Sequence, residues 1–164
     1  EDIKTLVGKI CRAFPDELTM HKGIADNCFE EFAGKVPLVL KCTTFGPVHF
    51  KQDIQVTEVG EAVAYGADAV IVKTIYSGAP DSFSKVVEAA PIKVAVAGGD
   101  ANTLEEVFTT AHDVIEAGGV GITFGRSVIQ AKDPTAMVTT LGKIVHERMS
   151  VQEALEFYND LSNK

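Results

Sequence analysis

A lysine that follows an apolar segment is the feature of this sequence with the clearest chemical potential. Residues 67–78 read ADAVIVKTIYSG, and five of the six residues that precede Lys73 are apolar. A run of this kind is typical of a strand buried on both faces of a parallel sheet. Lys73 then either lies just past the strand with its ammonium group in water, or is a desolvated amine that attacks a carbonyl group and forms an imine.

Glycines and a basic residue follow two later apolar segments in the same way. Gly98 and Gly99 come after one of them, and Gly125 and Arg126 come after the next. Backbone N–H groups of glycines can approach an anion closely, and the arginine adds positive charge, so these four residues make a candidate phosphate site. A tight turn is the alternative explanation for the two consecutive glycines, and it stays open.

Two further residues are candidates for supporting roles. Lys41 follows the apolar segment VPLVL, and as a second cation near Lys73 it would lower the pKa of that amine. Tyr76 is the one acid/base candidate close to Lys73 in the sequence. The alternative for Tyr76 is an aromatic side chain that belongs to a loop.

Short apolar segments alternate with helical spacing along the chain. This alternation predicts a parallel sheet with right-handed crossovers, either an open α/β sandwich or a (βα) barrel. In a barrel the carboxyl ends of all strands meet at one face, which would bring Lys41, Lys73 and the glycine pairs together. The predicted strands are 18–21, 36–40, 68–73, 92–97 and 121–124, and the predicted helices are 2–14, 27–33, 56–65, 82–90, 103–117, 134–148 and 150–158.

Length and composition narrow the class of protein. The 164 residues are 46% hydrophobic, which predicts one domain over residues 1–164 with a sizeable core. The net charge of -8 without a basic cluster argues against a nucleic-acid partner. The three cysteines form no C-x-x-C pair, and neither a secretory signal nor a long apolar span is present, so we expect a cytoplasmic protein that is not in a membrane. The four histidines are scattered, so no built-in metal site is expected.

Four segments of the sequence closely resemble the archaeal-type class I aldolase family. This family includes fructose-bisphosphate aldolases, 2-amino-3,7-dideoxy-heptulosonate synthase and the aldolase-like enzyme of autoinducer-2 phosphate breakdown. The resemblance implies a (βα)8 TIM barrel in which Lys73 forms the Schiff base, and in which Gly98, Gly99, Gly125 and Arg126 hold the substrate's phosphate. The segments are IVKTIYSG, AAPIKVAVAGG, DVIEAGGVGITFGRSVIQAKDP and KIVHERMSVQEALE.

The resemblance also sets expectations for the whole chain. It implies a class I aldolase without a cofactor that acts on a phosphorylated ketose or a related sugar phosphate, and we expect it to form a homo-oligomer. A full barrel needs over about 200 residues, so we expect an incomplete or reduced barrel. The family's Asp-His-Gly turn and its acid/base tyrosine have no counterpart here, and Asp100 replaces a basic residue or proline. The alternative is a catalytically impaired barrel fragment, or a phosphosugar-binding subunit that needs a second chain.

Overall fold

The computed structural model describes residues 2–41, 76–89, 94–98 and 103–163, the backbone of 43–45, 53–55 and 73–75, and the single positions Ala64 and Gly66. The chain divides into two compact units, which we call the N-terminal unit (Glu1–Ile71) and the C-terminal unit (Val72–Lys164). The single domain expected over residues 1–164 stays a prediction. Within the described ranges, no helix is both long and apolar enough to cross a lipid bilayer.

The N-terminal unit contains a pair of parallel strands packed against helices. Its core is apolar and includes Val7, Met20 and Leu38, all of them buried. In sequence order its elements are α1 (Ile3–Arg12), β1 (Leu18–Met20), α2 (Lys22–Cys28), the 3-10 helix η1 (Glu30–Phe32), β2 (Leu38–Leu40), β3 (Thr43–Phe45) and β4 (Asp53–Gln55). β1 pairs with β2 in parallel, whereas β3 and β4 form an antiparallel pair.

Two predictions for this unit were wrong. In place of one helix over 27–33 the structure has α2, which begins at Lys22 and ends at Cys28 with Gly23 in its first turn, and the 3-10 helix η1 over Glu30–Phe32. The segment 43–55, where the sequence predicts neither a strand nor a helix, contains the antiparallel pair β3 and β4, whose register joins Thr43 to Gln55. Pairing between residues this far apart in the sequence depends on tertiary structure, so local turn residues do not predict it.

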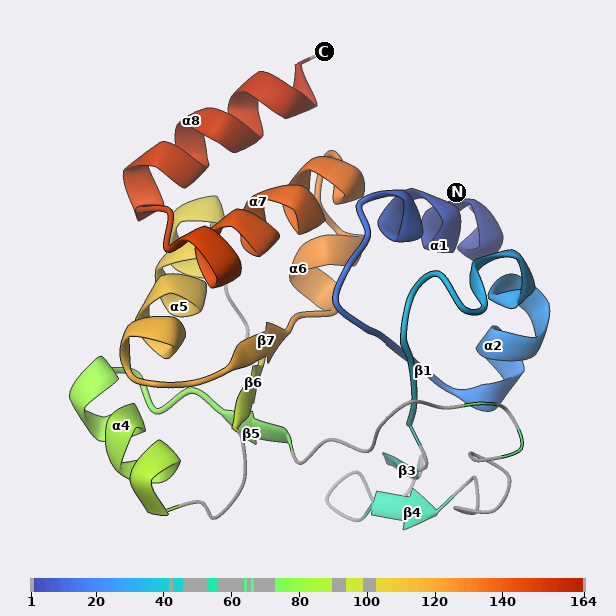
Figure 1. Ribbon diagram of the computed structural model, residues 1–164, viewed down its shortest axis with the longest axis horizontal. Helices are drawn as coiled ribbons and strands as arrows, with labels where there is room; N and C mark the ends of the chain where they lie inside the picture. Colours follow the sequence, from blue (N-terminus) through green and yellow to red (C-terminus); the bar gives the residue numbers. More distant parts are fainter. Residues whose placement is uncertain are drawn as a thin grey trace. The chain divides into compact units, whose positions relative to one another are not determined.

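The C-terminal unit is built on a parallel sheet with the strand order β5-β6-β7 (Figure 1). Its register aligns Lys73 with Ala95 and Ala95 with Gly121. The parallel strands expected from the sequence are thus confirmed here. The elements are β5 (Lys73–Ile75), α4 (Pro80–Ala89), β6 (Ala95–Ala97), α5 (Leu104–Glu116), β7 (Gly121–Thr123), α6 (Arg126–Ile129), α7 (Pro134–Glu147) and α8 (Val151–Ser162).

Helices α4 and α5 cover one face of this sheet (Figure 1). Phe83 of α4 and Val114 of α5 are fully buried against Val96 of β6, and Ile122 of β7 packs on the same cluster. Because side chains alternate along a strand, the residues on either side of Val96 and Ile122 belong to the opposite face.

The remaining helices pack outside α5. Helices α7 and α8 contact α5 and each other, and the ring of Phe108 meets that of Tyr158 edge-on with centroids 6.0 Å apart. Met137 and Ile144 of α7 are 1% and 0% exposed. The two capping boxes and the proline in the first turn of α7 explain why these helices begin where the sequence predicted.

One predicted helix lies largely outside the described residues. Of the segment 56–65, the structure describes Ala64, which is helical. Gly66 follows with a φ of 69°, the left-handed conformation expected of a glycine that ends a helix. This conformation agrees with the predicted end of the helix at residue 65.

Candidate active site

The carboxyl edge of the β5-β6-β7 sheet carries most of the predicted site residues. Ile75, Ala97 and Thr123 are aligned at the ends of the three strands. The chain therefore leaves the sheet at one edge through Tyr76, Gly98 and Phe124. The loops after parallel strands all begin at the same edge of the sheet, so the tertiary structure gathers residues that are distant in the sequence.

Lys73 is the first residue of strand β5, not a residue that follows a strand. The predicted strand ended at Lys73, but β5 continues through Thr74 and Ile75, whose backbones pair with Val96 and Ala97. β-branched residues favour such pairing, which extends the strand. The backbone of Lys73 is part of β5, so the alternative in which Lys73 lies just past the end of the strand is wrong.

In the register of the sheet, small residues lie beside Lys73. Lys73 is in one row with Ala95 and Gly121, and the next row holds Ala97 and Thr123. All four neighbours are partly exposed, whereas Val96 on the other face is fully buried under the helices. The face opposite α4 and α5 therefore has room beside the lysine position.

Gly98 has a structural reason to be glycine. A Cβ at Gly98 would lie 3.0 Å from Cδ1 and 3.3 Å from Cα of Phe124. The backbone N–H of Gly98 donates to the carbonyl of Thr123 at 3.3 Å, which joins the ends of β6 and β7. Close approach of two backbones thus explains this residue without a ligand. Gly99 lies outside the described residues, so its predicted contact with phosphate stays a prediction.

Gly125 and Arg126 form the exposed turn after β7. The carbonyl of Gly125 accepts hydrogen bonds from the N–H groups of Val128 and Ile129 at 3.1 and 2.9 Å, which starts the short helix α6. No described atom lies within 4 Å of the place where a Cβ of Gly125 would be. The turn is therefore open to a ligand, and Arg126, the first residue of α6, is exposed next to it.

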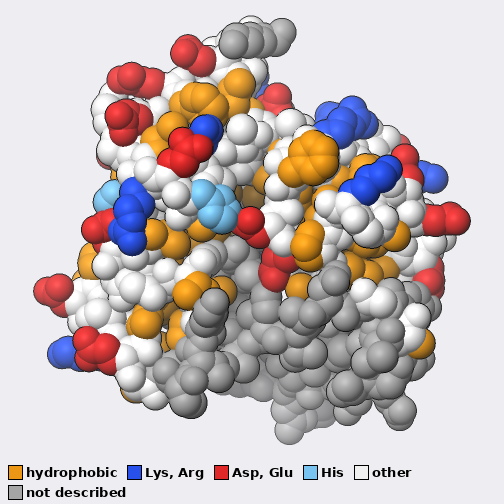
Figure 2. Space-filling view, viewed as in Figure 1, with side chains coloured by type: hydrophobic (Ala, Val, Ile, Leu, Met, Phe, Trp, Pro, Cys, Tyr) orange, Lys and Arg blue, Asp and Glu red, His pale blue; other side chains and the backbone are white. Residues whose placement is uncertain are grey.

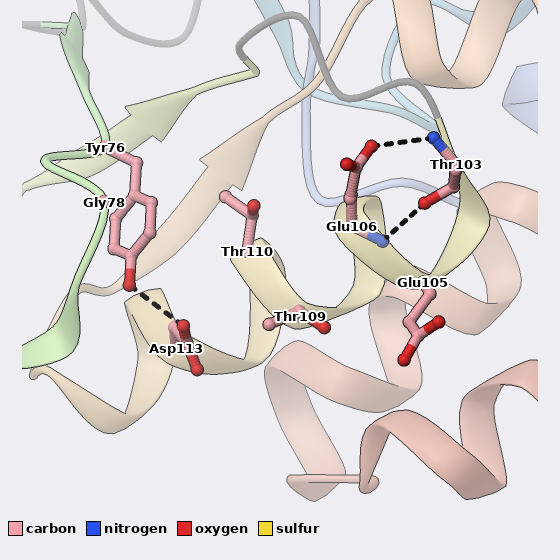
Figure 3. A pocket seen from close by; sticks show the side chains of 8 residues that line it. All are labelled: Tyr76, Gly78, Thr103, Glu105, Glu106, Thr109, Thr110 and Asp113. Carbon is pink, nitrogen blue, oxygen red and sulfur yellow. Dashed lines mark hydrogen bonds between the residues drawn. The ribbon is translucent and has the colours of Figure 1, made fainter.

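The side chain of Tyr76 contacts residues of α4 and α5, the two helices that cover one face of the sheet. Its hydroxyl group donates to Oδ2 of Asp113 on α5 at 2.9 Å (Figure 3), and its ring lies 5.7 Å from that of Phe83. Burial, together with the hydrogen bond to Asp113 and its negative charge, raises the pKa of Tyr76 above its ordinary value. A phenol with a raised pKa is poorly matched to proton transfer near neutral pH. Its packing agrees with the alternative of an aromatic residue in a loop.

A polar depression of about 450 Å³ lies along α5 beside Tyr76 (Figure 3). Glu106 on its wall is engaged in the capping box with Thr103, and Asp113 accepts from Tyr76. Glu106 and Asp113 thus have structural partners, and the depression lies on the helices' side of the sheet. Its lining residues are Tyr76, Gly78, Thr103, Glu105, Glu106, Thr109, Thr110 and Asp113.

Lys41 lies in the N-terminal unit, directly after β2. Its N–H group donates to the carbonyl of Met20 at 2.9 Å, and its carbonyl lies 3.1 Å from Nδ1 of His21. A carbonyl only accepts, so Nδ1 of His21 carries the proton in this contact. The role of Lys41 as a second cation near Lys73 stays a prediction.

Sequence analysis did not single out Ala95, Gly121, Asp113 or His21. A glycine inside the short apolar segment 121–124 was the one available signal, because glycine weakens a strand unless something approaches it closely. The other three depend on contacts across elements. Within the described ranges, no group of three or more His, Cys, Asp or Glu residues is arranged to hold a metal ion.

The fold is that of class I aldolase structures. The chain superposes on a crystal structure of an archaeal fructose 1,6-bisphosphate aldolase with a TM-score of 0.77 and 21% identity, covering 89% of this chain and 84% of that one. A Schiff base forming fructose-1,6-bisphosphate aldolase gives a TM-score of 0.75 and 22% identity, covering 88% of this chain and 84% of that one. The predicted fold class, α/β of the TIM-barrel type with parallel strands, is confirmed.

The family profile of the DeoC/LacD family aldolases matches residues 71–131. Over this segment, which includes all the predicted site residues except Lys41, the chain is similar to the DeoC/LacD family of aldolases. The family resemblance inferred from the sequence is therefore confirmed.

Three relatives differ in the length of their match. A 2-amino-3,7-dideoxy-D-threo-hept-6-ulosonate synthase of Halobacterium salinarum is 32% identical over 143 residues, 86% of this chain and 52% of the relative. An uncharacterized aldolase of Saccharolobus solfataricus is 37% identical over 92 residues, 56% of this chain and 33% of the relative. A 3-hydroxy-5-phosphonooxypentane-2,4-dione thiolase of an Enterobacter species is 29% identical over 109 residues, 66% of this chain and 36% of the relative. The chain thus spans between a third and about half of these relatives' length.

Proposed function

We propose that this chain is a class I aldolase that forms an imine between Lys73 and the ketone of a phosphorylated ketose or a related sugar phosphate. The observation that carries the proposal is the register of the sheet. Lys73 lies in β5, and the turns at Gly98 and Gly125 follow β6 and β7, the other two strands of the same parallel sheet. All of these residues fall within the segment that matches the aldolase family.

The reaction that we propose begins at the side-chain amine of Lys73. The Lys73 nitrogen attacks the ketone carbon, water leaves, and the protonated imine withdraws electrons from the carbon–carbon bond that lies one carbon away from the imine carbon. When that bond breaks, its electron pair passes into the enamine, the hydroxyl group on the departing carbon gives its proton to water, and an aldehyde leaves. Protonation of the enamine carbon and hydrolysis of the resulting imine then release the second product and restore the amine.

The phosphate of the substrate binds at the turns that follow β6 and β7. Gly98 begins the first of these turns, Gly99 and Gly125 contribute backbone N–H groups, and Arg126 contributes a guanidinium group that can make paired hydrogen bonds to phosphate oxygens. The exposure of Gly125 and Arg126 supports this assignment. Two of the similar proteins are also named after phosphorylated compounds. One is a fructose 1,6-bisphosphate aldolase, and the other is a 3-hydroxy-5-phosphonooxypentane-2,4-dione thiolase.

Borohydride trapping tests the imine directly. We expect reduction in the presence of dihydroxyacetone phosphate to leave a mass adduct on Lys73, and Lys73→Met to abolish it because no amine remains. Lys85→Met is the matched control, since Lys85 is an exposed lysine of α4 in the same unit. This control should keep the adduct. An unmodified wild-type chain, or an adduct on a different lysine, would rule the proposal out.

A second candidate function is binding of a phosphosugar without complete catalysis, as an impaired barrel fragment or as a subunit that needs a second chain. The bond between the Tyr76 hydroxyl and Asp113 favours it, because the acid/base candidate nearest to Lys73 in sequence is engaged elsewhere. Calorimetric binding of dihydroxyacetone phosphate without any trapped adduct would support this second candidate over the first.

A further inference from the structure

Four glycines of the C-terminal unit have a reason to be glycine within the fold. Gly78 and Gly118 have φ values of 91° and 90°, which side chains rarely adopt. Gly98 faces Phe124, and a Cβ at Gly119 would lie 2.7 Å from Cγ1 of Val114. Backbone conformation or close packing therefore accounts for these four residues.

Gly121 has neither reason. It is the first residue of β7, and its φ is not in the left-handed region. Among the described residues, no atom lies within 4 Å of the place where its Cβ would be. A glycine in a strand costs up to about 1 kcal/mol relative to alanine, and such a glycine often marks the close approach of a ligand or another backbone. Gly121 therefore weakens β7 without a compensating contact in the described fold.

The register gives Gly121 a place beside the lysine. Lys73, Ala95 and Gly121 form one row across the three strands, on the face away from Val96 and Ile122. Neighbouring strands are about 4.8 Å apart, so the backbones at the two ends of this row are roughly 10 Å apart. Along β7, Gly121 is followed by Thr123 in the next row and then by the open turn at Gly125.

We propose that Gly121 determines substrate specificity: its missing side chain leaves room for the carbon chain of a phosphorylated ketose, between the carbonyl carbon at Lys73 and the phosphate at Gly125 and Arg126. This inference rests on the function proposed above and deepens it. The expected substrates are ketoses whose carbon chain crosses β6 and β7 over Ala95 and Gly121. A side chain at Gly121 occupies the space through which that chain passes.

A pair of matched glycine substitutions tests this role. Gly142 lies within α7 with no described atom within 4 Å of its would-be Cβ, so Gly142→Ala is the control. Neither Gly121→Ala nor Gly142→Ala should lower the melting temperature, because alanine reduces the entropy of the unfolded chain. Calorimetry then measures the affinity of each full-length variant, and of Gly121→Val, for dihydroxyacetone phosphate and for inorganic phosphate.

We expect affinity for dihydroxyacetone phosphate to fall on the order of tenfold in Gly121→Ala, the effect of one methyl group that overfills a site. The loss should be larger in Gly121→Val and absent in Gly142→Ala. Affinity for inorganic phosphate should stay unchanged in Gly121→Ala, since phosphate alone does not cross Gly121. If Gly121→Val does not fold, Gly121→Ala decides the question.

The outcomes separate this inference from the proposed function. Wild-type affinity in both Gly121 variants would overturn the role of Gly121, whether or not Lys73 is trapped by borohydride. An equal loss of phosphate affinity in Gly121→Ala would also overturn it. Binding that depends on Gly121 without a trapped adduct would support the inference and reject the imine. A wild-type chain that does not bind dihydroxyacetone phosphate overturns both.

Discussion

At the scale of single residues, Tyr76 illustrates how packing changes the chemistry available to a side chain. Its position three residues after Lys73 made it a candidate acid or base. In the folded chain its ring packs against Phe83, and its hydroxyl group donates to Asp113. Burial of the phenol is the largest cause of the raised pKa of Tyr76. The hydrogen bond to Asp113 and the negative charge of that carboxylate raise the pKa further.

The raised pKa of Tyr76 predicts a loss of stability in alkali. The unfolded chain releases this proton near pH 10, the ordinary value, whereas the folded chain holds it to higher pH. The contribution is therefore fully present below pH 10 and is lost as the pH rises toward the folded pKa. We expect the free energy of unfolding, measured with urea, to fall more steeply above pH 10 in the wild type than in Tyr76→Phe.

Asp113→Asn provides the control for this pH dependence. The amide oxygen can still accept the hydroxyl group's hydrogen bond, but the negative charge is gone. Because burial is the largest cause of the raised pKa, the slope above pH 10 should become shallower without disappearing. Identical slopes in the wild type and Tyr76→Phe would contradict the assigned cause.

At the scale of elements, α5 connects the layers of the C-terminal unit. It packs on the sheet with Val114 and contacts α4, α7 and α8. Its first turn is held by a capping box, in which the Thr103 hydroxyl accepts from the N–H of Glu106 at 3.2 Å and the Glu106 carboxylate accepts from the N–H of Thr103 at 3.0 Å. The start of α5 is therefore fixed locally, and its burial comes from its neighbours.

Thr103→Ala is expected to lower the free energy of unfolding by about 1 kcal/mol, since an N–H group of the first turn loses its acceptor. Thr103→Ser keeps an oxygen at the same place and should stay close to the wild type. Urea denaturation monitored by circular dichroism measures both variants. Equal destabilisation by serine and alanine would show that the methyl group of Thr103 matters and the cap does not.

At the scale of the molecule, each unit has its own buried cluster of apolar side chains. Acidic residues stand out on α8, which carries Glu153, Glu156 and Asp160 and no lysine or arginine (Figure 2). The net charge of -8 and this acidic helix underlie the expectation that the chain has no nucleic-acid partner, which stays a prediction. Among the described residues, the large apolar side chains that are half exposed or more are Ile3, Phe14, Val120 and Ile129.

We predict that the chain forms a homo-oligomer, because an incomplete barrel exposes apolar edges that association can cover. Light scattering coupled to size exclusion should therefore give a mass that is a multiple of 17.5 kDa. A sample that stays monomeric at all accessible concentrations would contradict this prediction, and it would leave the tests of Lys73 and Gly121 unaffected.

Much of this protein was predictable because it is encoded locally. Capping residues, first-turn proline and apolar spacing are read within a few residues, so the helices α5, α7 and α8 begin where the sequence indicates. The strand at Lys73 was less predictable at its carboxyl end, because Thr74 and Ile75 join it through pairing with β6. The pair β3 and β4 was missed for the same reason.

The sequence by itself determined the candidate lysine, the glycine turns, the alternation of strands and helices, and the resemblance to aldolases. Only the tertiary structure decided which residues stand beside them. It aligned Gly121 with Lys73, set Gly98 against Phe124 and joined Tyr76 to Asp113. Chemical type and local spacing are properties of neighbouring residues, whereas register and packing depend on strands and helices that meet only when the chain folds.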